Sequence, residues 1–74
     1  MNKILVIGAL GQIGSELTLA LRKKYGTENV IASDLRPDTN KKLGESGVFE
    51  VVDVMDKDEL RNVIQKHNID SIFY

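Results

Sequence analysis

The segment that decides the fold is Lys3-Ile4-Leu5-Val6-Ile7, followed directly by Gly8-Ala9-Leu10-Gly11-Gln12-Ile13-Gly14. The apolar run predicts a buried strand, and the glycines predict a sharp turn into a helix. Gly8 lets the strand turn, Gly11 lets a ligand approach the backbone without meeting a Cβ atom, and Gly14 lets the helix pack close to the strand. Free N–H groups at such a helix start favour an anion, so the turn predicts a phosphate or pyrophosphate site.

The glycine spacing is G-x-x-G-x-x-G, because Ala9 stands where the commonest dinucleotide-binding fingerprint has its second glycine. Three glycines alone are a weak signal, but a preceding strand and a following helix strengthen it. The backbone donors expected to face the phosphates belong to the first helical residues, Gln12, Ile13 and Gly14.

An acidic residue after the second predicted strand supports a dinucleotide site. Residues 29–33 predict a short buried strand that Asp34 ends, about 20 residues beyond the glycine turn. A carboxylate there can accept hydrogen bonds from both adenosine ribose hydroxyls and repels a 2′-phosphate. The alternative is a turn-forming or helix-capping aspartate before Arg36-Pro37.

We expect Asp34, Leu35 and Arg36 to form the adenosine side of this site. A guanidinium such as that of Arg36 can serve a 2′-phosphate, but the carboxylate lies closer to the strand end. The predicted cofactor is therefore NAD rather than NADP.

Helices and strands alternate along the rest of the chain. We predict a helix over 12–24, a short turn near 40–43, a strand over 48–52, a helix from an Asp56 cap to about Lys66, and a strand over 69–74. The inward face of the first helix is expected to carry Ile13, Leu17, Ala20 and Leu21, with Glu16, Arg22 and Lys23 in water and Gly26 ending the helix.

This alternation predicts the α/β class. Right-handed crossovers give the strand order 3-2-1-4, with ligand binding where the order reverses between strands one and four. Residues 1–74 are thus expected to form one partial domain, the N-terminal half of a Rossmann doubly wound parallel sheet.

Composition excludes several classes of partner. The net charge is −1 with interspersed signs, so we expect no nucleic-acid partner. No apolar run approaches the length of a membrane span, and Met1-Asn2-Lys3 leads straight into the first strand, so we expect neither a membrane segment nor a signal peptide. The chain has no cysteine, which excludes thiolate metal sites and fits a cytoplasmic location; no metal site is expected.

These motifs resemble the extended short-chain dehydrogenases/reductases, the NAD-dependent epimerase/dehydratase group, over essentially the whole chain. That family usually has threonine before the first glycine, where this chain has Ile7. The resemblance implies that Asp53-Val54 contacts the adenine. Three stretches are similar to epimerase-like L-threonine 3-dehydrogenases: residues 11–17, 25–26 and 29–34.

Other polar residues have simpler interpretations. Asp53 is alternatively a loop aspartate that bonds nearby N–H groups, although Asp56 is the better helix cap. His67 is expected to lie partly exposed near a helix C-terminus, without a catalytic role. Tyr25 and Tyr74 are expected to pack with a solvated hydroxyl.

The resemblance also implies a catalytic tyrosine with a lysine four positions later, and this chain has no such pair. We therefore predict no catalytic residue here, only the adenosine and pyrophosphate part of an oxidoreductase's NAD site. The alternatives are part of a nucleotide-sugar epimerase or dehydratase, and a non-catalytic nucleotide-binding module that self-associates. The exposed edge of the fourth strand, 69–74, predicts a homo-oligomer.

Overall fold

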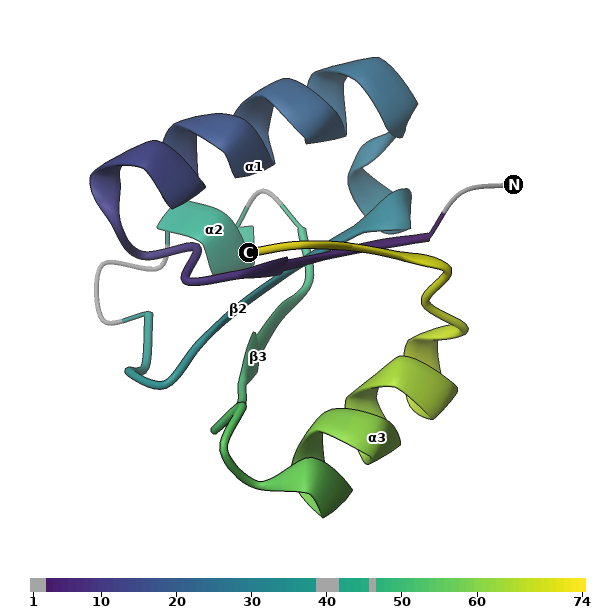
Figure 1. The fold of residues 1–74 in the computed structure, drawn as a ribbon. Coiled ribbons are helices and arrows are strands. Elements are labelled where there is room, and N and C mark those ends of the chain that lie inside the picture. The colour runs from purple at the N-terminus through teal and green to yellow at the C-terminus, as the bar shows by residue number, and fades with distance from the viewer. Residues whose placement is uncertain (1–2, 39–41, 46) are drawn as a thin grey trace.

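The computed structural model describes residues 3–38, 42–45 and 47–74, which form a four-stranded parallel sheet between helices (Figure 1). Along the chain the elements are β1 (Ile4–Ile7), α1 (Gln12–Tyr25), the short 3-10 helix η1 (Thr27–Asn29), β2 (Val30–Asp34), α2 (Lys42–Glu45), β3 (Phe49–Val51), α3 (Lys57–His67) and β4 (Ser71–Phe73). The strand order is β3-β2-β1-β4, which confirms the predicted class and topology.

The central strand β1 fixes the register of the sheet. Ile4 lies opposite Val30 of β2 on one side and Ser71 of β4 on the other, and Ala32 of β2 lies opposite Phe49 of β3. Every pairing is parallel, so the carboxyl ends of all four strands meet at one edge of the sheet.

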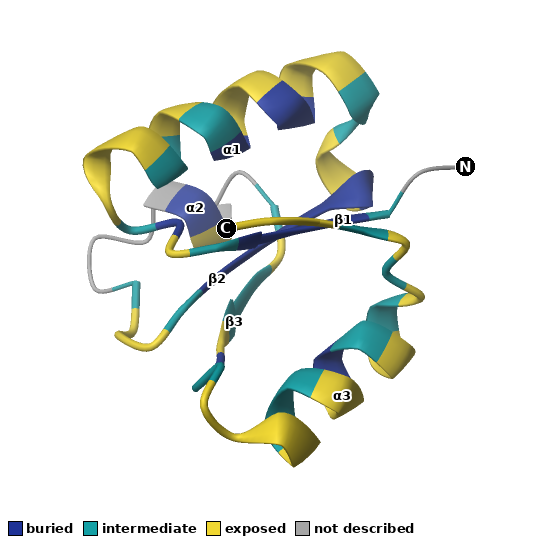
Figure 2. Cartoon of the chain, viewed as in Figure 1, coloured by how far each residue is buried: buried dark blue, intermediate teal, exposed yellow. Residues whose placement is uncertain are grey.

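Alternate side chains of the strands build two hydrophobic layers. One layer lies beneath α1 and α2 and contains Ile4, Val6, Ala9, Leu21, Val30, Ala32 and Leu43. The other lies against α3 and contains Leu5, Ile31, Val52 and Val63. Figure 2 shows that β1 and the start of β2 are the most continuously buried part of the chain, as expected for central strands of a parallel sheet.

Both ends of α3 are defined by capping residues. The Asp56 side chain accepts hydrogen bonds from the N–H groups of Asp58 and Glu59, so the predicted cap is confirmed. Asn68 ends the helix in the left-handed conformation (φ 54°), and the next residue, Ile69, donates its N–H to the carbonyl of Ile64.

The inward face of α1 differs from the predicted face. Ile13 is 82% exposed and Ala20 is also exposed, whereas Thr18 and Arg22 are buried. The difference arises because Gly14 packs directly on the turn, which rotates the following helix so that positions 14, 18, 21 and 22 face the sheet.

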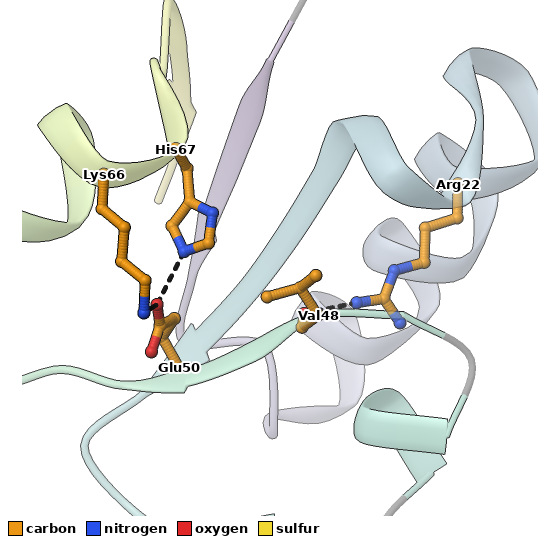
Figure 3. A network of polar contacts seen from close by, with 5 residues as sticks. All are labelled: Arg22, Val48, Glu50, Lys66 and His67. Atoms are coloured by element: carbon orange, nitrogen blue, oxygen red, sulfur yellow. Dashed lines mark hydrogen bonds and ion pairs between the residues drawn. The ribbon is translucent and has the colours of Figure 1, made fainter.

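Arg22 was expected in water but lies beneath the crossover between β2 and β3 (Figure 3). Its guanidinium donates to the carbonyls of Val30 (3.3 Å), Leu43 (2.7 Å) and Val48 (2.7 Å). The Val48 carbonyl also accepts the Ala32 N–H (3.0 Å), and the guanidinium adds a donor to these carbonyls in a part of the fold that is shielded from water. Burial lowers the pKa of Arg22, although the Asp38 carboxylate opposes this shift.

The predicted boundaries differ slightly from those observed. The third and fourth strands are shorter than predicted, ending at Val51 and Phe73. The short turn expected near 40–43 falls partly outside the described residues, and α2 begins at Lys42. No helix in the described part of the chain is long and apolar enough to cross a membrane.

Candidate functional site

The glycine turn connects the carboxyl end of β1 to α1. Gly8 has φ 78°, a conformation that residues with a Cβ atom rarely adopt, so its predicted role in turning the strand is confirmed. The turn is closed by a hydrogen bond from the Gly11 N–H to the Gly8 carbonyl (3.1 Å). The Ala9 N–H donates to the Ser33 carbonyl of β2 (2.9 Å), which fixes the turn against the sheet.

Gly14 is required by the packing of the chain itself. A Cβ atom at this position would lie 2.2 Å from the carbonyl oxygen of Gly8 and 3.1 Å from the Cα of Ala9. These are backbone atoms, which cannot move aside as a flexible side chain can. The predicted close packing at Gly14 is therefore confirmed.

Gly11 has no comparable conflict within the chain. A Cβ atom there would meet only the Gly8 carbonyl oxygen within 4 Å, at an ordinary contact distance of 3.4 Å. Its φ of −69° is also accessible to any residue. The described residues thus leave the space beside Gly11 open, which a ligand in contact with the backbone needs.

The N-terminus of α1 lacks the usual neutralising groups. Gly11 is the N-cap and supplies no side-chain hydrogen bond, and the first turn carries no acidic residue. By contrast, α3 has the Asp56 cap and two acids, Asp58 and Glu59, in its first turn. The N–H groups of Gln12, Ile13 and Gly14 belong to a turn in which an α-helix provides no acceptor of its own. This helix start is suited to an anionic ligand.

A cavity of about 550 Å³ opens at this helix start. It lies where the strand order reverses, between the carboxyl ends of β1 and β4, which is the place where the topology predicts ligand binding. Its lining residues are Val6, Ile7, Gly8, Gly11, Gln12, Ile13, Gly14, Leu17 and Tyr74. Ile13 and Tyr74, expected to pack in the core or as a partly solvated ring, instead form exposed walls of this cavity.

Asp34 lies at the end of β2 beside the glycine turn. Its Oδ2 accepts the Leu10 N–H (3.1 Å), and its Oδ1 accepts the Arg36 N–H (3.2 Å). Burial alone raises the pKa of Asp34, but the N–H groups of Arg36, Leu10 and Leu35 and the Arg36 guanidinium outweigh it and lower the pKa. The carboxylate is therefore ionised at neutral pH, with both oxygens held in fixed directions.

Arg36 forms an ion pair with this carboxylate. Its Nε lies 3.6 Å from Asp34 Oδ1, while its side chain remains 68% exposed and that of Asp34 is only 11% exposed. Leu35, between them, is 64% exposed. Asp34 thus does take part in the local turn, as its alternative interpretation proposed, and Oδ2, which lies away from the Arg36 contacts at Oδ1, can accept a further hydrogen bond from a ligand.

Asp53 and Val54 lie beyond β3, on the neighbouring strand end. Backbone pairing brings them near Asp34, because the Val52 N–H donates to the Asp34 carbonyl (2.9 Å). Asp53 Oδ1 accepts the Met55 N–H (2.9 Å), and the Asp53 N–H donates to Glu59 Oε1 (3.2 Å). The loop-bonding interpretation of Asp53 is observed, and contact of Asp53-Val54 with adenine stays a prediction.

His67 lies apart from this edge and faces β3 (Figure 3). Its Nε2 lies 2.6 Å from Glu50 Oε2, which also accepts from Lys66 Nζ (3.2 Å). The hydrogen bond from His67 is the main cause that lowers the pKa of Glu50, against the opposing effect of burial, with Lys66 contributing further. His67 therefore has a structural partner. Among the described residues, no group of three His, Cys, Asp or Glu side chains is arranged to hold a metal ion.

Sequence reasoning missed the Leu10 N–H as the donor that ties Asp34 to the turn. The only available signal was the position of Leu10 inside the glycine motif, since any residue except proline supplies the same N–H. This hydrogen bond connects the glycine turn, which is predicted to face the phosphates, to Asp34, which is predicted to face the adenosine.

The family model described as "NAD dependent epimerase/dehydratase family" matches residues 4–74. The chain belongs to this family. An uncharacterized epimerase/dehydratase of Staphylococcus epidermidis is 42% identical over the whole chain. The resemblance to the epimerase/dehydratase group is therefore confirmed.

Solved structures of L-threonine dehydrogenases are similar to the chain in both fold and sequence. The enzyme from Clostridium difficile superposes with a TM-score of 0.90 and 51% identity over 97% of this chain. A GalE-like L-threonine dehydrogenase from Cupriavidus necator, in its holo form, superposes with a TM-score of 0.84 and is 43% identical over 95% of this chain. The chain spans 23% of the Staphylococcus epidermidis and Clostridium difficile proteins and 22% of the Cupriavidus necator protein.

Proposed function

We propose that this chain forms the adenosine and pyrophosphate part of the NAD site of an oxidoreductase that resembles L-threonine 3-dehydrogenase. The observation that carries the proposal is the pairing of an uncapped glycine helix start with an ionised carboxylate, tied together by the Leu10–Asp34 hydrogen bond. Membership of an NAD-dependent family and the likeness to threonine dehydrogenases support it.

The pyrophosphate would lie on the glycine turn. The N–H groups of Gln12, Ile13 and Gly14 supply hydrogen bonds, and the positive end of the α1 dipole favours the negative charge. The open space beside Gly11 allows the phosphate oxygens to approach the backbone. These residues fit the group, because nothing in the first turn of α1 competes for its donors through a side-chain cap or an acid.

The adenosine ribose would be held by Asp34. The Leu10 and Arg36 N–H groups orient the carboxylate, and its remaining lone pairs can accept the 2′- and 3′-hydroxyl protons. Asp53, Val54 and the exposed Leu35 would bound the adenine. Burying the exposed side chain of Leu35 against a planar base adds a favourable apolar contact.

NAD, when bound, accepts a hydride from the carbon of a secondary alcohol. The role of these residues is to bind and orient the cofactor. The acid–base step needs a group such as a tyrosine with a lysine four positions later, and this sequence contains none. We propose that the catalytic pair and the alcohol site belong to the rest of a longer protein, since the chain spans only 23% of its first relatives.

Two alternatives follow from other observations. The family description and the Staphylococcus relatives favour part of a nucleotide-sugar epimerase or dehydratase, in which bound NAD is regenerated in each cycle. A non-catalytic nucleotide-binding module would bind NAD without any reaction. Assays of a longer protein containing this chain, with L-threonine and with nucleotide sugars, separate the dehydrogenase from the epimerase or dehydratase.

Calorimetry on this chain with NAD⁺, NADH and ADP tests the nucleotide site. We expect binding, and we expect Asp34→Ala to weaken NAD⁺ by about tenfold to a hundredfold, because a charged acceptor of two hydrogen bonds is lost. Asp58→Ala, which removes an exposed acid from α3, is the matched control and should bind as the parent does. Equal affinity of the Asp34 variant and the parent contradicts the ribose assignment.

A turnover assay tests the absence of catalysis. The pure chain with L-threonine and NAD⁺ should form no NADH, because positioned acid–base groups alone contribute about 10²–10⁴ in rate. NADH formation by a sample free of any longer enzyme contradicts this assignment of roles.

A further inference from the structure

The turn between β3 and α3 holds Asp53 by both of its backbone groups and by one carboxylate oxygen. The Asp53 carbonyl accepts the Asp56 N–H (2.9 Å), where the chain turns back into α3 (Figure 1). Its Oδ1 accepts the Met55 N–H (2.9 Å), and its own N–H donates to Glu59 Oε1 (3.2 Å). Two of these three hydrogen bonds lie inside the turn, and the bond to Glu59 reaches outside it.

The position of Asp53 at the end of an edge strand explains why its N–H has a partner on a helix. In the described sheet, β3 pairs with β2 alone. The Val52 N–H donates to the Asp34 carbonyl of β2 (2.9 Å), and successive N–H groups of an extended chain point to opposite sides. The Asp53 N–H therefore points away from β2, and the Glu59 carboxylate supplies the acceptor that a neighbouring strand would otherwise provide.

The other carboxylate oxygen of Asp53 is left for a ligand. Among the described residues, none donates a hydrogen bond to Oδ2. A carboxylate oxygen only accepts hydrogen bonds, so it suits the exocyclic amine of a 6-aminopurine, which donates. It opposes the 6-oxo group of hypoxanthine, which accepts. The direction of Oδ2 thus governs how well the two bases are told apart, and that direction depends on how the turn is held.

We propose that Glu59 is a positioning residue: by holding the Asp53 N–H it fixes the direction of Asp53 Oδ2, and so sets a preference for 6-aminopurine over 6-oxopurine nucleotides. The inference rests on the proposed nucleotide site and adds to it a residue of α3 that does not touch the ligand. The side chain of Asp58, the neighbouring acid in the first turn of α3, is instead paired with Arg61 of the same helix (3.8 Å).

Calorimetry of the chain with adenosine 5′-monophosphate and inosine 5′-monophosphate tests the proposal, because the two nucleotides share their ribose and phosphate. The ratio of the first affinity to the second, the base ratio, should exceed one in the parent. Glu59→Ala should lower the base ratio by about threefold to tenfold, because the hydrogen bond that orients the turn is lost. Glu59→Gln keeps an acceptor oxygen on a side chain of the same length and should keep the base ratio within about twofold.

Two further variants separate positioning from the stability of α3. Asp58→Ala is the matched control, since it removes an acid from the same helical turn and leaves the contact with Asp53 in place. It should keep the base ratio of the parent. Glu59→Asp covers the case in which Glu59→Ala folds poorly, because it retains the acid that favours the helix start but is shorter by one methylene group. Its base ratio should fall as in Glu59→Ala.

The outcomes distinguish this inference from the proposed function. An equal loss of both nucleotides in Glu59→Ala and Glu59→Asp shows a purely structural role for Glu59 and overturns the inference. A parent with equal affinity for the two nucleotides, or an equal fall of the base ratio in Asp58→Ala, overturns it as well. A parent that binds neither nucleotide contradicts the proposed nucleotide site itself, and the inference with it.

Discussion

The glycines of the turn meet different demands, and the difference is visible in single interatomic distances. At Gly14 an added Cβ atom would lie 2.2 Å from the Gly8 carbonyl oxygen, so the chain cannot fold around a larger residue without shifting its backbone. At Gly11 the same atom would have only an ordinary contact at 3.4 Å. The fold therefore requires Gly14, whereas the proposed ligand requires Gly11.

Substitution at Gly14 should lower the stability of the chain, whereas substitution at Gly11 should raise its stability slightly and weaken ligand binding. Gly14→Ala should lower the free energy of unfolding by about 2 kcal/mol or more, through overpacking against backbone. Gly11→Ser should raise it by a few tenths of a kcal/mol, because serine is a better N-cap at this extended position. The serine hydroxyl would occupy an N–H of the first turn, so Gly11→Ser should also weaken NAD⁺.

Urea unfolding of both variants and calorimetry of Gly11→Ser check this contrast. Retained NAD⁺ affinity in Gly11→Ser, with the expected gain in stability, shows that the helix start does not hold the phosphates. A Gly14→Ala protein as stable as the parent shows that the close packing at the turn relaxes at little cost.

At this scale, residue type reveals some roles and conceals others. Gly8 and Gly14 could be predicted because a positive φ and a close approach both demand glycine, and Asp34 because its position follows from the motif spacing. Arg22 could not, because its burial depends on backbone carbonyls, such as those of Val30, Leu43 and Val48, that come from separate segments of the chain. Their meeting point depends on the path of the crossover, which has no local sequence signal.

At the scale of elements, the strongest predictions came from periodicity and caps. Asp56 begins α3 as predicted, but Glu59 bonds the Asp53 N–H (3.2 Å) instead of completing a reciprocal bond with the cap residue. The predicted buried face of α1 was wrong at Ile13 and Ala20, because the contact of Gly14 with the Gly8 carbonyl sets the rotation of the helix. Tertiary contact thus decided what helical spacing left open.

The left-handed residue at the end of α3 yields a stability prediction. Asn68 has φ 54°, a conformation that glycine adopts freely and alanine adopts at a cost of roughly 1 kcal/mol. Asn68→Ala should therefore destabilise the chain by about 1 kcal/mol, and Asn68→Gly should leave it equal or slightly more stable. Thermal or urea unfolding of the two variants checks the order, and equal stability of both would show that the cap frays in solution.

The contact between α3 and β3 should make stability depend on acidity. His67 and Lys66 lower the pKa of Glu50 below its ordinary value of 4.5. A carboxylate with a lowered folded-state pKa contributes stability above its unfolded pKa and loses that contribution as the pH falls through the folded value. Glu50→Gln should therefore cost up to about 1 kcal/mol near neutral pH, and this cost should vanish in acid.

Urea unfolding of the parent and Glu50→Gln across the acidic range tests the effect. The two stability curves should converge as the pH falls below the ordinary range of glutamate. A constant difference at every pH shows that the Glu50 carboxylate does not stabilise the packing of α3 through its charge.

On the scale of the whole molecule, both faces of the sheet are incompletely covered near β4. Ile72 is 48% exposed and Phe73 40% exposed, although their β1 partners Leu5 and Val6 are buried. β4 pairs with β1 alone in the described sheet, so its outer edge presents unpaired backbone groups. The sequence predicted this edge because the order 3-2-1-4 leaves the fourth strand outermost.

We predict that isolated copies of this chain associate through β4. An edge strand with exposed apolar side chains is a template for a second strand, and pairing would also bury Ile72 and Phe73 from two copies. Sedimentation velocity at micromolar concentration should show a dimer or larger species in equilibrium with monomer. Ile72→Lys should shift that equilibrium to monomer, because a charge on an edge strand opposes pairing.

Leu19→Lys is the matched control, since Leu19 is equally apolar and 50% exposed but lies on α1. A parent that sediments as a monomer at every concentration contradicts the prediction, and so does equal dissociation by the two lysine variants, which would place the contact elsewhere than at the sheet edge.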